Sequence, residues 1–359
     1  MTDNVLSRLR PELIKLQAYA VPDATGLVKL DAMENPFTWP IAMRTKWLDR
    51  ISHAQVNRYP EPNPEGLKQK LKDQFGPHDN SSDILLGNGS DELIQLLVLA
   101  VAKPGACILT VSPSFSMYQM IAEMIGIDCH VVPLDENYEI EKLAMLNAIE
   151  EYDPALIFLA YPNNPTGNMW GRSDIQAIMD NSKGIVVIDE AYGPFAADSF
   201  TDDLKNNNNM LLLRTASKLG LAAIRFGWLA GDRALIAELN KIRLPYNINQ
   251  LTQLTMEFAL DNYELFAEQA EIIRSLRGSM FGQLSAIEGV KPYTSEANFI
   301  LIKVLASDAS EVFDSLLEQK VLIKNVSKQA GLDQCLRVTV GSKEENKIFC
   351  DALINVLKK

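Results

Sequence analysis

A lysine stands among apolar neighbours in the stretch RTASKLGLAAIRFGW, residues 214–228. Lys218 follows the run MLLLRT, which is typical of a buried strand, and the mostly apolar LAAIRFGW comes after it. Because burying an unpaired ammonium is costly, the ordinary interpretation is that the lysine stem packs while its head reaches water. The alternative is an amine whose pKa is lowered by desolvation, so that it is partly unprotonated and can attack a carbonyl carbon. The other polar residues of the chain decide between these interpretations.

A glycine-rich turn offers a place for an anion. In GNGSDELIQLL the chain leaves an apolar run through Gly87 and Gly89 and enters a helix that we expect Ser90 to cap. Free backbone N–H groups and the helix dipole at such a helix start favour a phosphate, although the carboxylate of Asp91 in the first turn opposes it. Strand–glycine–helix junctions are also common without a ligand, so this segment alone is a weak indication.

Two further apolar runs end in polar side chains. The loop YPNNPTGNMW, residues 161–170, follows ALIFLA, and a plain turn accounts for its prolines and glycine better than for Asn164. In IVVIDEAYGPF, residues 185–195, the expected strand ends in Asp189, and Tyr192 follows three residues later. An acid at the end of a buried strand is as often a cap for the next turn as a ligand for a bound group.

Together these clusters match the functional groups of one ligand, pyridoxal 5′-phosphate. The glycine-rich turn, Ser217 and Arg225 fit its phosphate, and Asp189 fits its protonated ring nitrogen. An amide and a phenol, Asn164 and Tyr192, fit its ring oxygen.

The aldehyde of this cofactor is bound by a lysine as a Schiff base, a role that Lys218 fits. The amine of Lys218 therefore has a chemical reason to be semi-buried. We interpret Lys218, Asp189 and Tyr192 as the catalytic residues.

These side chains need a sheet to bring them together. From about residue 50 to 250, short apolar runs alternate with helical segments, which indicates a largely parallel sheet covered on both faces. In such open α/β sheets, ligands bind beyond the carboxyl ends of the strands, where these clusters fall. The runs are DILLGNGS, ACILTVSP, CHVVPL, ALIFLAYP, GIVVIDEAY, NMLLLRTAS and FGWLAGD.

The remaining chain has a different character. Residues 1–30 resemble an arm with little core of their own. After residue 250, a long helical stretch precedes the strand NFILIKV, another helix, the strand pair VLIKN and CLRVTV, and a last helix. We predict an α/β fold in three parts: an arm that also joins the small domain (1–50), a large cofactor-binding domain (51–250) and a smaller α+β domain (251–359).

Composition and charge argue against several classes of protein. A net charge of −12 without a basic stripe disfavours a nucleic-acid partner. The four cysteines have neither CxxC nor metal-ligand spacing, and the three histidines are scattered, which predicts a reduced protein without a metal. The N-terminal sequence has no apolar signal core and no apolar run is long enough for a bilayer, so we expect a cytoplasmic protein that does not bind membranes.

The ordered motifs NNPTG, DEAY and SK…R.G resemble those of the fold-type I aminotransferases. More narrowly, LDAMENPF, NRYPEPNPEGLKQKL, GNGSDELI, PSFSMY, ANFILIKV and CLRVTVGSKEEN resemble the histidinol-phosphate aminotransferase family, over nearly the whole chain. The resemblance implies a fold-type I, pyridoxal-phosphate-dependent transferase. It also implies ping-pong exchange of an amino group between glutamate or 2-oxoglutarate and histidinol phosphate or imidazole-acetol phosphate, in histidine biosynthesis.

The resemblance also implies roles for single residues at the cofactor. Lys218 would be the Schiff-base lysine, Asp189 would contact the pyridine nitrogen, and Asn164 and Tyr192 would contact the ring oxygen. Phe115 stands where the family usually has the tyrosine that stacks on the cofactor ring. The residues implied around the phosphate are Ser90, Asp91, Thr215, Ser217 and Arg225.

Further residues are implied at the substrate and at a second subunit. Tyr59 in NRYP would reach the phosphate of the neighbouring subunit's cofactor, which implies a homodimer with shared active sites. Arg337 resembles an arginine that binds a carboxylate or phosphate through two hydrogen bonds, although a strand arginine can also be a surface ion-pair partner. Lys324 stands where relatives can have a second arginine and keeps its charge without the planar fork. Tyr19 and Asn35 would approach the substrate from the N-terminal arm.

Other functions stay open at this point. An aminotransferase for aromatic or other amino acids would have the same fold, as would a decarboxylase of a phosphorylated amino acid, which would release CO2 without a keto acid. Regulatory proteins that bind pyridoxal phosphate carry an added DNA-binding domain, for which this chain has neither room nor basic charge. A generic α/β binding protein without the cofactor is the remaining alternative.

Overall fold

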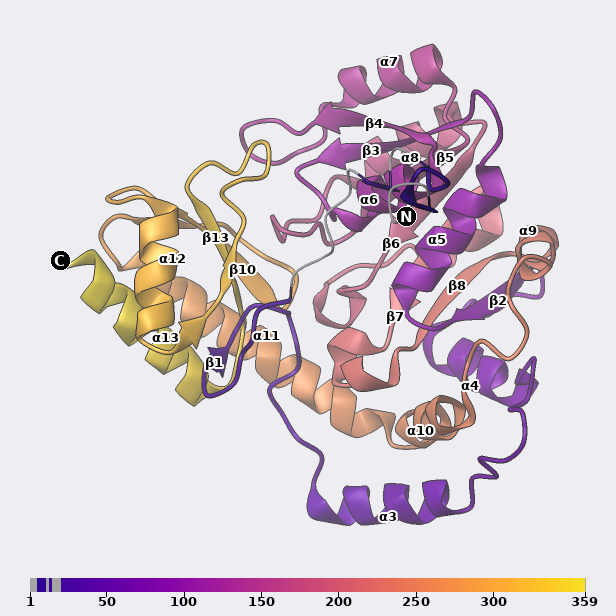
Figure 1. The fold of residues 1–359 in the computed structure, drawn as a ribbon, viewed down its shortest axis with the longest axis horizontal. Coiled ribbons are helices and arrows are strands. Elements are labelled where there is room, and N and C mark those ends of the chain that lie inside the picture. The colour runs from indigo at the N-terminus through magenta and orange to yellow at the C-terminus, as the bar shows by residue number, and fades with distance from the viewer. Residues whose placement is uncertain (1–4, 11–12, 15–20, 359) are drawn as a thin grey trace.

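The structure, a computed structural model, describes residues 5–10, 13–14 and 21–358 (Figure 1). Its largest sheet has seven strands: β2 (Ser82–Gly87), β3 (Cys107–Ser112), β4 (Asp128–Pro133), β5 (Leu156–Ala160), β6 (Ile185–Asp189), β7 (Met210–Thr215) and β8 (Gly227–Asp232). They lie in the order β2-β8-β7-β6-β5-β3-β4. The pairs formed among β3 to β7 are parallel, while β8 is antiparallel to both of its neighbours. The sheet is therefore parallel except at β8.

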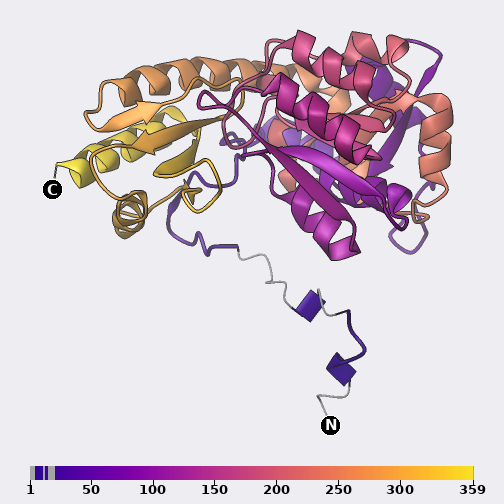
Figure 2. The ribbon, with the colours of Figure 1, turned by 90° about the horizontal axis from the view of Figure 1, so that it is seen from above.

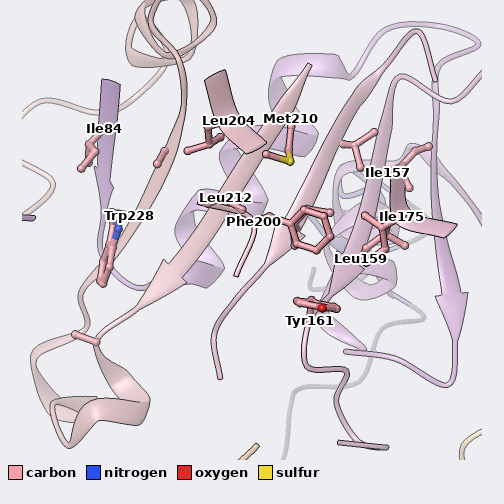
Figure 3. Close-up of a cluster of buried hydrophobic side chains, with 14 of the residues drawn as sticks. Ile84, Ile157, Leu159, Tyr161, Ile175, Phe200, Leu204, Met210, Leu212 and Trp228 are labelled. Atoms are coloured by element: carbon pink, nitrogen blue, oxygen red, sulfur yellow. The ribbon is translucent and has the colours of Figure 1, made fainter. Parts of the chain in front are cut away.

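Helices cover both faces of this sheet because its strands are apolar on both sides. In β7, Leu211 belongs to a core that it shares with α5 (Ser90–Val101), α6 (Met117–Ile125) and α9 (Arg233–Asn240). Its neighbour Leu212 points to the opposite face, into the core shown in Figure 3. The helices that contribute to this second core include α4 (Glu65–Phe75), α7 (Lys142–Tyr152), α8 (Arg172–Asn181) and α10 (Gln250–Asp261).

A smaller unit lies beside the large sheet (Figure 2). Its antiparallel sheet has the order β12-β13-β10-β9, with bounds Lys324–Asn325, Cys335–Thr339, Phe299–Val304 and Val290–Pro292. A separate core lies between this sheet and the helices α11 (Tyr263–Ser285), α12 (Ala309–Glu318) and α13 (Lys343–Leu357). The short strand β1 (Val28–Lys29) pairs in parallel with β11 (Val321–Leu322), so the chain just before residue 30 joins this unit.

The predicted α/β class is confirmed, and each of the seven apolar runs overlaps one strand of the large sheet. The domain limits predicted at residues 50 and 250 match the packing less well. Helix α3 (Ile41–Ser52) packs on α10, and Phe258 of α10 belongs to the core of the large sheet. Helix α11 then runs from Phe266 in that core to Leu284 in the core of the small unit (Figure 1). The large core thus extends past residue 250, and one helix spans both units.

The described part of the chain lacks two kinds of feature. None of its helices is long and apolar enough to cross a membrane. Its His, Cys, Asp and Glu side chains form no group of three or more that could hold a metal ion.

Candidate functional site

A cavity of about 250 Å³ opens where β5, β6 and β7 end. These strands are parallel, so their last residues, Ala160, Asp189 and Thr215, meet at one edge of the sheet. The start of α5 and the segment Ala32–Glu34 also line the cavity. It brings together these residues predicted from the sequence: Ser90, Asp91, Phe115, Asn164, Asp189, Tyr192, Thr215, Ser217, Lys218 and Arg225.

Lys218 lies just beyond β7 in a short 3-10 turn, Ser217–Leu219. Its Nζ donates a hydrogen bond to the carbonyl oxygen of Ala32 at 3.1 Å. Burial, aided by the positive charge of Arg337, lowers the pKa of Lys218 to about 8. A fraction of the amine is therefore neutral at physiological pH, as a nucleophile or a proton acceptor requires.

Asp189 is the last residue of β6 and is only 4% exposed. Its Oδ2 accepts a hydrogen bond from the phenol of Tyr118 at 2.6 Å, and its Oδ1 accepts one from the backbone N–H of Ala191 at 3.0 Å. Burial nevertheless raises the pKa of Asp189 to about 6, and the negative charges of Asp91 and Glu190 act in the same direction. A buried carboxylate in this setting is suited to a cationic partner inside the cavity.

Asn164, Tyr192 and Arg337 form a connected polar group. The Asn164 amide donates to the phenol oxygen of Tyr192 at 3.0 Å, and its carbonyl oxygen accepts from Arg337 Nη1 at 2.6 Å. Arg337 Nη2 also donates to the carbonyl oxygen of Asp31 at 2.8 Å. Four segments that are distant in the sequence are thus joined here, and an amide and a phenol are held side by side on the cavity wall.

The start of α5 forms the end of the cavity that suits an anion. Gly89, rather than Ser90 as predicted, is the N-cap, and it has a φ of 87° with no side-chain cap on the first turn. A Cβ at Gly89 would lie 2.7 Å from Arg225 Nη2, so the absent side chain is what admits the guanidinium. Arg225 also approaches Asp91 Oδ2 at 3.2 Å and Ser217 Oγ at 3.4 Å. The expected opposition of Asp91 to an anion is therefore offset by an adjacent cation.

The predicted residues that do not line the cavity have different surroundings. The amide of Asn35 donates to the carbonyl oxygen of Leu219 at 3.1 Å and to Gln269 Oε1 at 2.9 Å, so it ties the N-terminal segment to the lysine turn. Lys324 is paired opposite Arg337 across β12 and β13. Tyr59 is 80% exposed, and Tyr19 falls outside the described residues.

Sequence reasoning missed Tyr118 and the segment Ala32–Glu34. Tyr118 lies three residues after Phe115 in PSFSMY, a spacing that places both near one face of the helix start. The rings of these two residues are in edge-to-face contact, with centroids 5.4 Å apart. The motif therefore contained a signal for Tyr118, but nothing local indicated that its phenol would reach Asp189.

Comparisons with known proteins agree with this geometry. Residues 25–353 match the family described as aminotransferase class I and II. Histidinol-phosphate aminotransferase 2 of Nitrosococcus oceani is 46% identical over 98% of this chain and 98% of its own. Histidinol-phosphate aminotransferase 1 of Ralstonia nicotianae is 45% identical over 98% of this chain and 95% of its own.

The fold likewise has solved counterparts. The crystal structure of a histidinol-phosphate aminotransferase from Sinorhizobium meliloti, in complex with pyridoxal 5′-phosphate, matches with a TM-score of 0.86. The match covers 98% of both chains at 23% identity, and it confirms the expected fold-type I architecture.

Proposed function

Because the chain belongs to the aminotransferase class I and II family of pyridoxal-phosphate-dependent enzymes, we propose that it is a histidinol-phosphate aminotransferase. The reaction reversibly moves an amino group between histidinol phosphate and 2-oxoglutarate, giving imidazole-acetol phosphate and glutamate, in histidine biosynthesis. The observation that carries the choice of substrate is the near-full-length match, at 45–46% identity, to relatives that bear this name.

The cavity residues fit pyridoxal phosphate at three chemically different points. Lys218 is an amine with a lowered pKa, Asp189 is a buried carboxylate, and Arg225 is a cation at a helix start. When bound, the cofactor supplies an aldehyde that takes up amino groups and a protonated ring that withdraws electrons from the α-carbon. Lys218, Asp189 and Arg225 match the aldehyde, the ring nitrogen and the phosphate of the cofactor, respectively.

The residues of the cavity have different roles in the proposed transamination. Lys218 would hold the cofactor covalently, and its amine, when free, would act as the general acid and base that moves a proton between the α-carbon and C4′. A pKa of about 8 for Lys218 suits both directions of that transfer. Asp189 would keep the proton on the ring nitrogen, while Asn164 and Tyr192 would bind the ring oxygen.

The remaining assignments concern binding. Phe115, which lines the cavity, would stack on the ring. The phosphate would be held by side chains at the start of α5 and the lysine turn: Ser90, Asp91, Thr215, Ser217 and Arg225. We assign Arg337, which is hydrogen-bonded to Asn164, to the carboxylate or phosphate of the substrate. Lys324, Asn35 and Tyr19 complete the proposed substrate contacts.

We further propose a cytoplasmic homodimer with shared sites. Support comes from an exposed apolar surface around Tyr59, whose ring stacks on Tyr246 with centroids 4.5 Å apart. Val56 and Leu244, close to these two residues in the chain, are 80% and 73% exposed. Such neighbouring apolar side chains are suited to burial against a second copy, which would bring Tyr59 to the partner's cofactor phosphate.

A panel of amino donors tests the proposed substrate directly. The purified, cofactor-loaded protein is assayed with 2-oxoglutarate and histidinol phosphate, histidinol, tyrosine or phenylalanine. Because the phosphate would make charge-assisted hydrogen bonds, we expect kcat/KM to fall at least about tenfold when it is removed from histidinol phosphate. Equal or faster turnover of the aromatic amino acids would instead indicate an aromatic aminotransferase. Release of CO2 from a phosphorylated amino acid without a keto acid would indicate a decarboxylase.

A further inference from the structure

Tyr118 has no role in the function proposed so far, yet it contacts Asp189 directly. It belongs to α6 and is fully buried, at 0% exposure. Its phenol donates the 2.6 Å hydrogen bond to Asp189 Oδ2, while the backbone N–H of Ala191 donates to Oδ1. One donor on each oxygen fixes the plane of the carboxylate.

Aromatic packing fixes the phenol in turn. The ring of Tyr118 stacks on Phe158, with centroids 4.5 Å apart and planes 3° from parallel. It also meets Phe115 edge-on, at 5.4 Å and 84°, and Phe115 lines the cavity. Since these contacts hold the ring independently of its hydroxyl, Tyr118 can orient Asp189 before any ligand binds.

We propose that Tyr118 is a positioning residue for the ring nitrogen of the cofactor: its hydroxyl keeps Asp189 oriented and ionised, so that the proton they share stays on the nitrogen. The inference rests on the role of Asp189 proposed above. A carboxylate and a pyridine nitrogen in hydrogen-bond contact share one proton, and the stronger base holds it. A donor to the carboxylate makes the carboxylate the weaker base.

The groups that face Asp189 explain why such a donor matters. Burial raises the pKa of Asp189, and the negative charges of Asp91 on α5 and of the adjacent Glu190 raise it further, whereas the Tyr118 hydrogen bond lowers it. Tyr192, just after β6, faces it as a neutral phenol, because burial also raises the pKa of Tyr192. Burial and the nearby Asp189 carboxylate raise the pKa of Tyr118 well above its ordinary range, so its hydroxyl remains a donor at neutral pH.

The protonation of the ring nitrogen can be measured by ¹⁵N NMR of the holoenzyme loaded with pyridoxal phosphate that carries ¹⁵N at that atom. Tyr118→Phe keeps the stacked ring and removes only the hydroxyl. Loss of a hydrogen bond to a charged group predicts that the ratio of protonated to unprotonated nitrogen falls about 10- to 100-fold. The matched control is Tyr161→Phe, which removes another buried phenol that donates to an aspartate, Asp198 at 3.2 Å, but does not line the cavity. We expect the control to give the wild-type spectrum.

Each outcome decides the proposal. A wild-type spectrum for Tyr118→Phe would overturn the role of Tyr118. Asp189→Asn serves as the reference for a nitrogen without its carboxylate, and a wild-type spectrum there would overturn the role of Asp189 and the inference built on it. Urea unfolding of the cofactor-free variants checks the fold. Loss of the fold or of cofactor binding in Tyr118→Phe alone would contradict the proposal. A positioning hydroxyl changes which atom holds the shared proton, and the fold does not depend on it.

Discussion

Replacing Asp189 with asparagine should stabilise the cofactor-free protein above pH 6 while removing most activity of the loaded enzyme. Asp189 is 4% exposed, and burial raises its pKa from 3.8 to about 6. Between these values the folded state binds more protons than the unfolded state, so wild-type stability falls as the pH rises through this window. Above this pH window, the loss of wild-type stability is complete. Asparagine carries no charge to desolvate, so the variant does not lose stability there.

The difference between the two pKa values of Asp189 sets the size of the effect. The rise from 3.8 to about 6 corresponds to about 3 kcal/mol in the free energy of unfolding. The asparagine oxygen can still accept from Ala191, but its amide faces Tyr118, whose phenol must turn to accept and loses its own acceptor. That loss reduces the expected gain to about 1–2 kcal/mol.

Urea unfolding of the cofactor-free wild type and Asp189→Asn, at one protein concentration and at several pH values from 4 to 8, measures this gain. The variant's advantage should be smallest at pH 4 and reach its full value above pH 7. In the loaded enzyme, kcat should fall on the order of 100-fold or more, since a preorganised charge has been removed from the site. A variant that is no more stable than wild type at pH 8, or that keeps near-wild-type turnover, would refute the reasoning.

Three further changes test other parts of the site. Lys218→Met should stabilise the cofactor-free protein by about 1–2 kcal/mol at pH 7, because burial lowers the pKa of Lys218 from 10.5 to about 8 and partial exposure reduces the effect. This gain should shrink between pH 8 and 10.5 in urea titrations, and a gain independent of pH would contradict it. Gly89→Ala, which places a Cβ 2.7 Å from Arg225, should weaken cofactor binding at least about tenfold in equilibrium dialysis. Gly105→Ala, with a similar φ and no atom near its Cβ, should not weaken it. If Tyr59 completes the partner's site, a heterodimer of Lys218→Ala and Tyr59→Phe has one intact site. When Tyr59→Phe alone is impaired, mixing the two variants and allowing subunit exchange should therefore give more activity than the average of the separate variants. No recovery of activity would place Tyr59 in its own subunit's site.

The sequence predicted the fold and the cavity well because both depend on local signals. Apolar runs of strand length alternate with helices, and the carboxyl ends of parallel strands meet at one edge whatever lies between them. The side chains that end β6 and β7, Asp189 and Thr215, therefore had to lie close together. The turn after β7 places Lys218 beside them for the same reason.

Long-range packing accounts for what the sequence did not predict. The apolar face of α10 suits either core, and only the tertiary contacts of Phe258 assign it to the large sheet. The amide of Asn35, a predicted substrate contact, also donates hydrogen bonds to Leu219 and Gln269, residues more than 180 positions away. At the N-cap of α5, the guanidinium of Arg225 occupies the space that a side chain at Gly89 would need. None of these partners is visible in a local pattern.

The most direct test of the account is the identity of the lysine that binds the cofactor. The holoenzyme is reduced with borohydride, digested and mapped by mass spectrometry for the peptide that carries the reduced cofactor. The account predicts that the modification lies on Lys218, in the peptide from TASKLGLAAIR, and that Lys218→Ala shows none. Attachment to another lysine, or no attachment in protein saturated with pyridoxal phosphate, would contradict the central claim.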